Sequence, residues 1–277
     1  MKKSVSLFLI ILMFSTLFSS VRADVLVLIH GWAANAETWV HSGVLPVLQA
    51  KGWSNAGIVT ATPEGGILYY EGDKTLNSNK VYRVHLPADA PLQIQAAHLY
   101  SELLFIANRH AKDKITLAGH SAGGVVSRLV LIGPNAPRVD ALIAIASPNL
   151  GTDRAVQGLD IVHDRPFFCP GPGIAFLKDT LGGDSYQYLK HSQGALVDLT
   201  PATPGTLIGW LNQQPHPSIA YHSIVRRSGD ELVPAFSQDL NQVTQLSGKS
   251  KLYLTDASHS LSPADGHLLL KILTEKD

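Results

Sequence analysis

The feature that most constrains the fold is the alternation of short apolar runs with longer amphipathic segments. The runs at 25–29, 115–118 and 141–146 are continuously apolar or nearly so and contain many β-branched residues, as strands do when both faces of their sheet are covered. Segments at 91–110 and 122–132 have the length and apolar spacing of helices. This alternation predicts βαβ units, and therefore an α/β fold with a mostly parallel central sheet and helices on both faces.

Weaker patterns complete the expected order of elements. The segment Glu64–Lys80 is rich in Gly, Asn and Asp and is predicted to be a loop or a hairpin. In the helix at 91–110 we expect one buried apolar face, formed by Ile94, Ala97, Leu99, Leu103, Leu104 and Ile106. Further strands are predicted at 58–61, 81–86, 219–225 and 251–254, and further helices at 44–50 and 263–273.

The regular alternation breaks between Leu150 and Pro217. This segment contains Cys169-Pro170-Gly171-Pro172-Gly173 and the further prolines Pro166, Pro201, Pro204 and Pro215 among short apolar patches. It is too long for a plain connection. We therefore expect residues 24–277 to form a single domain with a cap inserted at about 150–217.

The N-terminus has the pattern of a secretory signal. Lys2 and Lys3 precede an uncharged stretch from Ser4 to Val21, and Val21 and Ala23 occupy the small-residue positions of a cleavage site. Residues 1–23 are therefore predicted to be a signal peptide, and the mature chain to be exported, periplasmic or secreted. The alternative is an uncleaved anchor, because the apolar stretch approaches membrane-spanning length.

Composition excludes several classes of protein. With 22 basic and 22 acidic residues and 45% hydrophobic residues, the chain is neither a disordered chain nor a dedicated nucleic-acid binder. Cys169 is the single cysteine, so an internal disulfide and a multi-thiolate zinc site are both impossible. We expect Cys169 to be buried as a small apolar residue, with an intermolecular disulfide as the alternative.

One motif carries the chemistry. Gly119-His120-Ser121-Ala122-Gly123 matches G-x-S-x-G and stands between the predicted strand at 115–118 and the predicted helix at 122–132. In this context the serine occupies a sharp strand-to-helix turn, which needs small neighbours such as Gly119 and Gly123. Ser121 is therefore the candidate nucleophile, with the helix N-terminus directed at the developing negative charge.

A serine hydroxyl needs an adjacent base. In this type of sheet the partners follow the serine in the order acid, then histidine. His259 follows the predicted strand at 251–254 directly and is the favoured base. His267 is the alternative, although it falls within an apolar helical run.

The acid should lie in the loop after the strand at 219–225. Asp230 follows Gly229 in that loop and is favoured over Glu231, whose side chain is longer. Asp256 is interpreted as an ordinary loop carboxylate, and Asp198 comes too early to lie beside a strand end.

An anion-stabilising loop is the third requirement of such a site. His30-Gly31-Trp32 follows the first strand, and its glycine lets the backbone approach a reacting carbonyl. The expected donors are the backbone N–H groups of Trp32 and of Ala122, the residue after the candidate nucleophile.

Together these motifs resemble the α/β-hydrolase superfamily, and within it the secreted bacterial lipases and carboxylesterases. The similarity runs from about Val25 to Leu273. It rests on the serine motif and on the segments His30-Gly31-Trp32-Ala33, Ser147-Pro148-Asn149-Leu150-Gly151-Thr152, Asp198-Leu199-Thr200-Pro201 and Gly229-Asp230 to Val233-Pro234. The resemblance implies an α/β-hydrolase fold and a triad of Ser121, Asp230 and His259.

The resemblance also implies cleavage of carboxylic esters without a cofactor. Some of these lipases bind a structural calcium, but no carboxylate pair here matches its ligands, so no metal is expected. Apolar cap patches at 167–168, 174–177 and 207–210 predict a hydrophobic wall over the serine and a small-molecule or lipid ester as substrate, with transient contact to a membrane surface. The alternatives are a thioesterase or amidase, an acyltransferase, and a non-catalytic protein that binds an apolar ligand.

Overall fold

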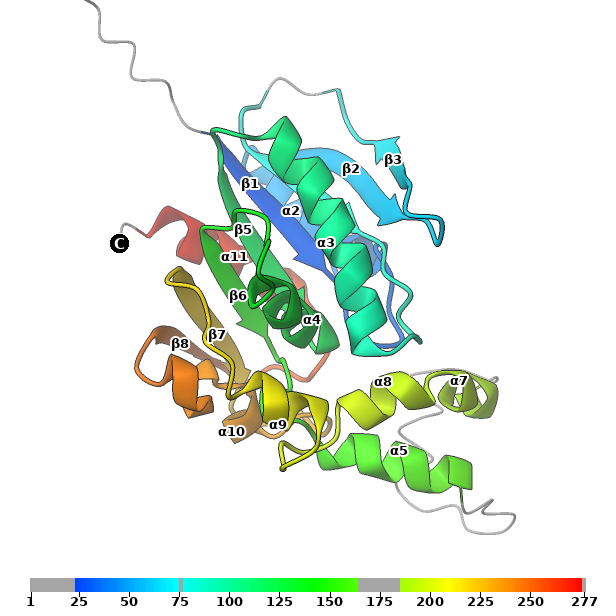
Figure 1. Ribbon diagram of the computed structural model, residues 1–277. Helices are drawn as coiled ribbons and strands as arrows, with labels where there is room; N and C mark the ends of the chain where they lie inside the picture. Colours follow the sequence, from blue (N-terminus) through cyan, green and yellow to red (C-terminus); the bar gives the residue numbers. More distant parts are fainter. Residues whose placement is uncertain (1–22, 75–76, 164–184, 276–277) are drawn as a thin grey trace, which may run out of the picture.

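The computed structural model describes residues 23–74, 77–163 and 185–275, which form one eight-stranded sheet (Figure 1). The strand order is β3-β2-β4-β1-β5-β6-β7-β8, and β3 alone runs antiparallel to its neighbour. The strands are β1 (Asp24–Ile29), β2 (Ser54–Ala61), β3 (Ile67–Glu71), β4 (Lys80–Val84), β5 (Lys114–His120), β6 (Ala141–Ile145), β7 (Ala220–Arg226) and β8 (Ser250–Thr255).

Helices cover both faces of the sheet. In Figure 1, α3 (Leu92–Arg109) and α4 (Ala122–Leu131) lie in front, and α2 (Val44–Ala50) and α11 (Pro263–Thr274) lie behind. The short helices are α1 (Thr38–His41), α10 (Ala235–Gln238) and the 3₁₀ turns η1 (Leu240–Gln242) and η2 (Thr244–Leu246). The predicted α/β architecture is confirmed, as are the predicted strands and helices of the sheet region.

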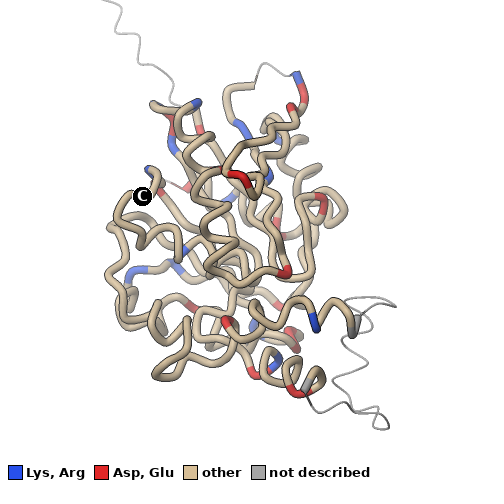
Figure 2. The backbone as a smooth tube through the Cα atoms, turned by 45° about the vertical axis from the view of Figure 1, so that its right-hand side comes forward, with Lys and Arg blue, Asp and Glu red and all other residues tan. Residues whose placement is uncertain are grey.

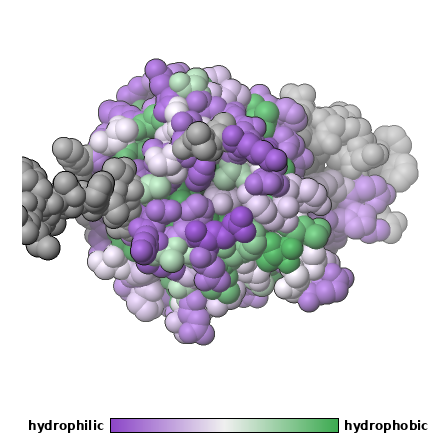
Figure 3. Space-filling model, turned by 90° about the horizontal axis from the view of Figure 1, so that it is seen from above, coloured by the Kyte–Doolittle hydropathy of each residue, from purple (hydrophilic) through white to green (hydrophobic). Residues whose placement is uncertain are grey.

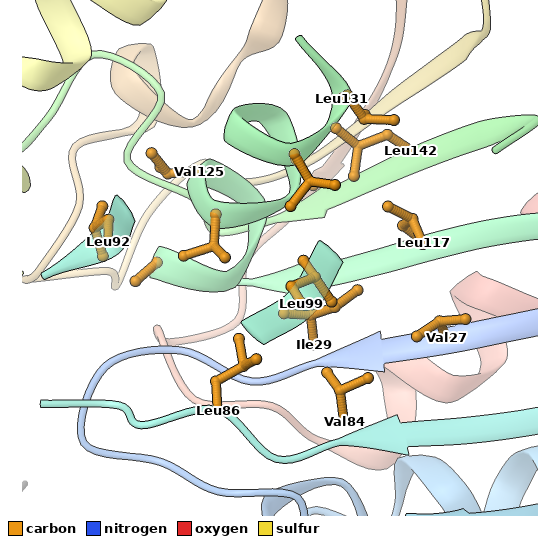
Figure 4. Close-up of a cluster of buried hydrophobic side chains, with 14 of the residues drawn as sticks. Val27, Ile29, Val84, Leu86, Leu92, Leu99, Leu117, Val125, Leu131 and Leu142 are labelled. Atoms are coloured by element: carbon orange, nitrogen blue, oxygen red, sulfur yellow. The ribbon is translucent and has the colours of Figure 1, made fainter. Parts of the chain in front are cut away.

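The packing of β1 explains why its sequence is continuously apolar. Val27 and Ile29 pack into the core beneath α3 and α4 (Figure 4), and Val25 belongs to the same cluster, while Leu26 and Leu28 pack into the core beneath α2 and α11. Successive side chains of a strand point to opposite faces, so a strand covered twice needs an apolar residue at every position.

One detail of the α3 prediction is wrong. Ile94 and Leu104 are 48% and 37% exposed, and Ala97 is exposed as well. Gln95 and Glu102 are instead buried on the face that packs against the sheet. Gln95 donates through its amide to the carbonyl oxygen of Ala90, and Glu102 accepts from a backbone N–H of β2. Because both polar groups are bonded to loop or strand backbone, the helix tolerates them at buried positions.

The segment Glu64–Lys80 contains a hairpin strand. β3 pairs antiparallel with β2 and forms one edge of the sheet. Gly57 adopts φ +112°, and a Cβ there would collide with the backbone of Tyr70 and Glu71. Glycine therefore permits the two strands to approach at this irregular point of β2.

Between β6 and β7, the described residues (up to 163 and from 185) form four helices. They are α5 (Asp153–His163), α7 (Ser185–His191), α8 (Gln193–Asp198) and α9 (Leu207–Leu211). Figure 1 shows them at the end of the molecule where the parallel strands finish, which is the position expected for a cap. Cys169 and the apolar patches at 167–168 and 174–177 lie outside the described residues, as do residues 1–22 of the predicted signal peptide.

The rest of the surface is mixed in character. Over the described residues, acidic and basic side chains are interspersed along the chain (Figure 2). The end of the molecule opposite the cap helices shows hydrophilic and hydrophobic side chains side by side (Figure 3). No helix of the described residues is long and apolar enough to span a membrane.

Candidate active site

Ser121 occupies the turn between β5 and α4. Its backbone has φ 52° and ψ −128°, a conformation that non-glycine residues rarely adopt and that costs on the order of 1–3 kcal/mol. A Cβ on Gly119 would lie 2.6 Å from the Cα of Gly124, and a Cβ on Gly123 would lie 2.5 Å from the carbonyl oxygen of His30. The predicted need for small residues around the serine is therefore borne out by the packing.

Three side chains distant in the sequence meet at this turn. His259 Nε2 lies 2.9 Å from Ser121 Oγ, and His259 Nδ1 lies 2.8 Å from Asp230 Oδ2. A carboxylate can only accept, so Nδ1 carries the proton and Nε2 is left to accept from the serine hydroxyl. The structure thus joins the serine, the histidine and the carboxylate in one hydrogen-bonded chain.

The Asp230 carboxylate is fully occupied by donors. Oδ1 accepts from the backbone N–H groups of Leu232 and Val233 at 2.9 and 3.0 Å, and Oδ2 accepts from His259 and from Gln238 Nε2. Burial by itself raises the pKa of Asp230, but the hydrogen bond and the charge of His259, together with the two backbone donors, hold the pKa below its ordinary value. The carboxyl group is therefore ionised at neutral pH, as a partner of an imidazolium must be.

The competing candidates lie elsewhere. The side chain of Glu231 is exposed, Asp256 forms an exposed ion pair with Arg227, and Asp198 accepts from the N–H of Leu92 at the start of α3. His267 lies on α11 in a groove lined by Lys51 and Trp53. None of these four side chains joins the hydrogen-bonded chain.

The loop after β1 passes directly over the serine. A Cβ on Gly31 would lie 2.8 Å from the Cβ of Ser121, so glycine is required for this approach. Within the described part of the chain, the N–H groups of Trp32 and Ala122 have no hydrogen-bond acceptor. This leaves both amides without a competing acceptor, as the predicted role of oxyanion donors requires.

His30 holds this loop in place. Its Nε2 accepts from the N–H of Leu86 at 3.0 Å, so its Nδ1 carries the proton and donates to the carbonyl oxygen of Gly31. Burial lowers the pKa of His30 to about 4. The ring is thus neutral, as this pair of hydrogen bonds demands.

An apolar pocket opens beside Ser121 and His259. It contains about 640 Å³ of space not filled by atoms, a figure that includes its open mouth. The lining comes from three cap helices and from the loops after β1, β6 and β7: Trp32, Pro148, Thr152, Arg154, Ala155, Gln157, Gly158, Ile161, Leu189, Leu196, Leu199, Leu232 and Val233.

The predicted cap patch at 207–210 does not contribute to this wall. Ile208 is buried in the core, and Trp210 is 48% exposed in a separate groove that includes Gln93 and Asp198. Ile208 and Leu211 of α9 belong to the core cluster that includes residues of α3 and α4, and no residue of α9 lines the pocket.

His120 is a site residue that the sequence did not identify. Its Nε2 lies 2.9 Å from the carbonyl oxygen of His259, and the two rings are 5.1 Å apart. Because a carbonyl can only accept, Nε2 of His120 must donate. Burial, followed by the charge of His259, lowers the pKa of His120 to about 3, so the ring is neutral. The variable position of G-x-S-x-G gives no signal for this contact.

A metal has no evident place in the described residues. Within them, no three His, Cys, Asp or Glu side chains are grouped so that they could hold an ion.

Comparisons with known proteins give the same architecture. A family model described as the PGAP1-like alpha/beta domain matches residues 93–162, which include Ser121. No curated protein sequence is significantly similar to this chain.

Several solved structures are similar over nearly the whole chain. A gene product of Listeria innocua has a TM-score of 0.59 at 15% identity, covering 92% of this chain and 95% of its own. The mature lipase BlEst2 of Bacillus licheniformis has a TM-score of 0.59 at 16% identity, covering 91% and 90%. A lipase-esterase related protein of Clostridium acetobutylicum has a TM-score of 0.53 at 13% identity, covering 91% and 93%. The chain therefore has the α/β-hydrolase fold.

Proposed function

We propose that this protein is an exported serine hydrolase of the lipase and carboxylesterase type, which cleaves esters of apolar acyl groups. The observation that carries the proposal is the hydrogen-bonded chain from Ser121 through His259 to Asp230 at the mouth of an apolar pocket. A nucleophile, a base and an orienting acid in this geometry are the machinery of acyl transfer.

The first half-reaction forms an acyl-enzyme. His259 Nε2 takes the hydroxyl proton as Ser121 Oγ attacks the ester carbonyl, and Asp230 stabilises the imidazolium that results. The N–H groups of Trp32 and Ala122 donate to the oxyanion of the tetrahedral intermediate, and each such donor is worth on the order of 10²–10³ in turnover. His259 then gives its proton to the leaving alcohol.

The second half-reaction repeats these steps with water. His259 removes a proton from water, which attacks the acyl-enzyme, and Ser121 is regenerated when the proton returns to its oxygen. Both halves begin from a neutral imidazole, so activity should fall in acid as His259 becomes protonated. A pH–rate profile that stays flat down to about pH 4 would contradict this mechanism.

The pocket supports an apolar acyl group as substrate. Ile161, Leu189, Leu196 and Leu199 supply an aliphatic wall in the pocket that Ser121 also lines. An acyl chain in this pocket would exchange water for apolar contacts at about 25 cal/mol per Å² buried. A small-molecule or lipid ester fits this description, and an exported enzyme would meet lipid esters at a membrane surface.

A panel of p-nitrophenyl esters of increasing acyl length tests the proposal. We expect hydrolysis by the parent protein, a preference for acyl chains that reach the aliphatic wall, and loss of activity in Ser121→Ala. Hydrolysis that persists in Ser121→Ala contradicts the proposal, and so does an absence of activity on every ester. Product analysis with added alcohol separates hydrolysis from transfer to another acceptor.

A further inference from the structure

We propose that Gln238 is a positioning residue for the triad, one that fixes the Asp230 carboxylate against His259 and shares its negative charge. The inference rests on the proposed function, because it assigns Gln238 a role in the same reaction. Gln238 is the last residue of α10 and is completely buried.

The orientation of the Gln238 amide is determined by its partners. Its Oε1 accepts from the backbone N–H of Arg226 at 2.7 Å, and a backbone N–H can only donate. The amide nitrogen must therefore face the other way. There it donates to Asp230 Oδ2 at 3.0 Å and to the carbonyl oxygen of Val233 at 2.7 Å. A flipped amide would place two donors together at Arg226 and two acceptors together at Asp230.

Gln238 is itself held rigidly. Its backbone carbonyl accepts from Asn149 Nδ2 at 2.9 Å, and the neighbouring Ser237 donates through Oγ to the carbonyl oxygen of Gly151. Helix α10 is thus tied to the loop that follows β6, while the Gln238 amide is tied to the end of β7. The acid is positioned by two strands of the sheet, although it lies on a surface loop.

The contact matters because of where it falls on the carboxylate. The backbone donors of Leu232 and Val233 occupy Oδ1, whereas Gln238 and His259 share Oδ2. Gln238 therefore prevents the carboxylate from rotating Oδ2 away from the imidazole of His259. It also competes for the negative charge on that oxygen, because a hydrogen bond to an ionised acceptor is stronger than one between neutral groups.

The other ionisable groups around Asp230 and His259 do not compete with Gln238 for the negative charge on Oδ2. His120 of β5 is neutral, Arg226 of β7 is paired with Asp265 of α11, and Glu231 is exposed to solvent. The hydrogen bond from Gln238 is thus the contact that tunes how strongly Asp230 stabilises the imidazolium.

If Gln238 shares the charge on Oδ2, its loss should move the acid limb of kcat/KM in a direction that a purely structural role does not predict. Without the Gln238 donor, more of the charge on Oδ2 falls on His259, the imidazolium is favoured, and the acid limb of kcat/KM moves to higher pH. If the loss merely loosened the Asp230 loop, the imidazolium would lose its partner and the acid limb would move to lower pH or stay where it is.

The experiment compares two variants of the full chain with the parent. Gln238→Leu removes both donors, and we expect kcat to fall about tenfold with little change in KM and an upward shift of the acid limb. Gln238→Glu keeps the size and can retain the Arg226 contact. Burial and the neighbouring Asp230 carboxylate raise the pKa of the introduced carboxyl group, so it keeps its proton, can donate to Oδ2, and should leave the acid limb closer to that of the parent than Gln238→Leu does. Gln245→Leu, at an exposed position, is the matched control and should leave both quantities unchanged.

Proton NMR of the His259 Nδ1–H adds a readout that needs no turnover. We expect its downfield resonance to move further downfield in Gln238→Leu, because the remaining hydrogen bond to Oδ2 strengthens. An unchanged acid limb, or one shifted to lower pH, overturns the inference even if kcat falls, and so does an unmoved resonance. Failure of the proposed function is separate: it would show as a parent protein without Ser121-dependent activity, and the resonance would still test the contact.

Discussion

The substitution Glu102→Gln should make the protein more resistant to unfolding at alkaline pH. Glu102 lies on α3 with no exposed surface, and its Oε1 accepts from the N–H of Ala61 at 2.9 Å. Its Oε2 has no hydrogen-bond partner among the described residues. Burial, opposed by the hydrogen bond from Ala61, raises the pKa of Glu102 from 4.5 to about 8.

The sign and size of the effect follow from proton linkage. Between pH 4.5 and 8 the folded protein keeps the proton on Glu102 and the unfolded chain does not. The free energy of unfolding therefore falls as pH rises through that window and is fully retained below it. At about 1.36 kcal/mol per pKa unit, the loss approaches about 5 kcal/mol at the alkaline end, as an upper bound.

Glutamine keeps an oxygen for the N–H of Ala61 but cannot ionise. We therefore expect parent and variant to unfold at similar urea concentrations at pH 5, and the variant to be more stable by several kcal/mol at pH 9. The exposed Glu64→Gln substitution is the matched control and should leave the pH dependence of the parent unchanged. Parallel stability curves for the parent and Glu102→Gln from pH 5 to 9 would refute the reasoning.

Three further predictions concern the site. His259→Gln should abolish ester hydrolysis while His267→Gln keeps it, and steady-state assays that find His259→Gln as active as the parent would reject His259 as the base. His120→Phe keeps a ring but loses the donor to the His259 carbonyl, so kcat should fall about tenfold while the protein stays folded. A kcat equal to that of the parent would show that the contact is dispensable. A Cβ on Gly158 would lie 3.2 Å from Leu196 Cδ1 in the pocket wall. Gly158→Leu should therefore reduce hydrolysis of long acyl esters and spare acetate esters. An unaltered chain-length profile would mean that acyl chains bind elsewhere.

The sheet and the serine turn could be predicted because their signals are local. An apolar run such as 25–29 reports burial on both faces, and small residues on each side of Ser121 report a turn with no room for side chains. The order of acid and base along the chain then selected Asp230 and His259 from many candidates, and the structure brings both to the serine.

The errors arise where tertiary contacts override a local pattern. Ile94 and Leu104 fit an apolar face by spacing, yet the buried face includes Gln95 and Glu102 because backbone groups from other segments bond to them. The pocket wall was assigned in part to 207–210, although Ile208 is buried in the core and Trp210 lines a separate groove.

Sequence patterns could not predict the residues that support the triad. His120 acts on the carbonyl of a residue 139 positions away. Gln238 acts on Asp230 through a helix of four residues that has no apolar periodicity. Such contacts depend on how loops are placed in space, and spacing along the chain does not encode them.

Labelling with a fluorophosphonate, mapped by mass spectrometry, asks most directly whether the serine is activated by its neighbours. We predict one phosphonyl group per chain, attached to Ser121, with labelling that slows sharply in His259→Gln. Labelling at a different residue, or none in a correctly folded parent protein, would contradict it.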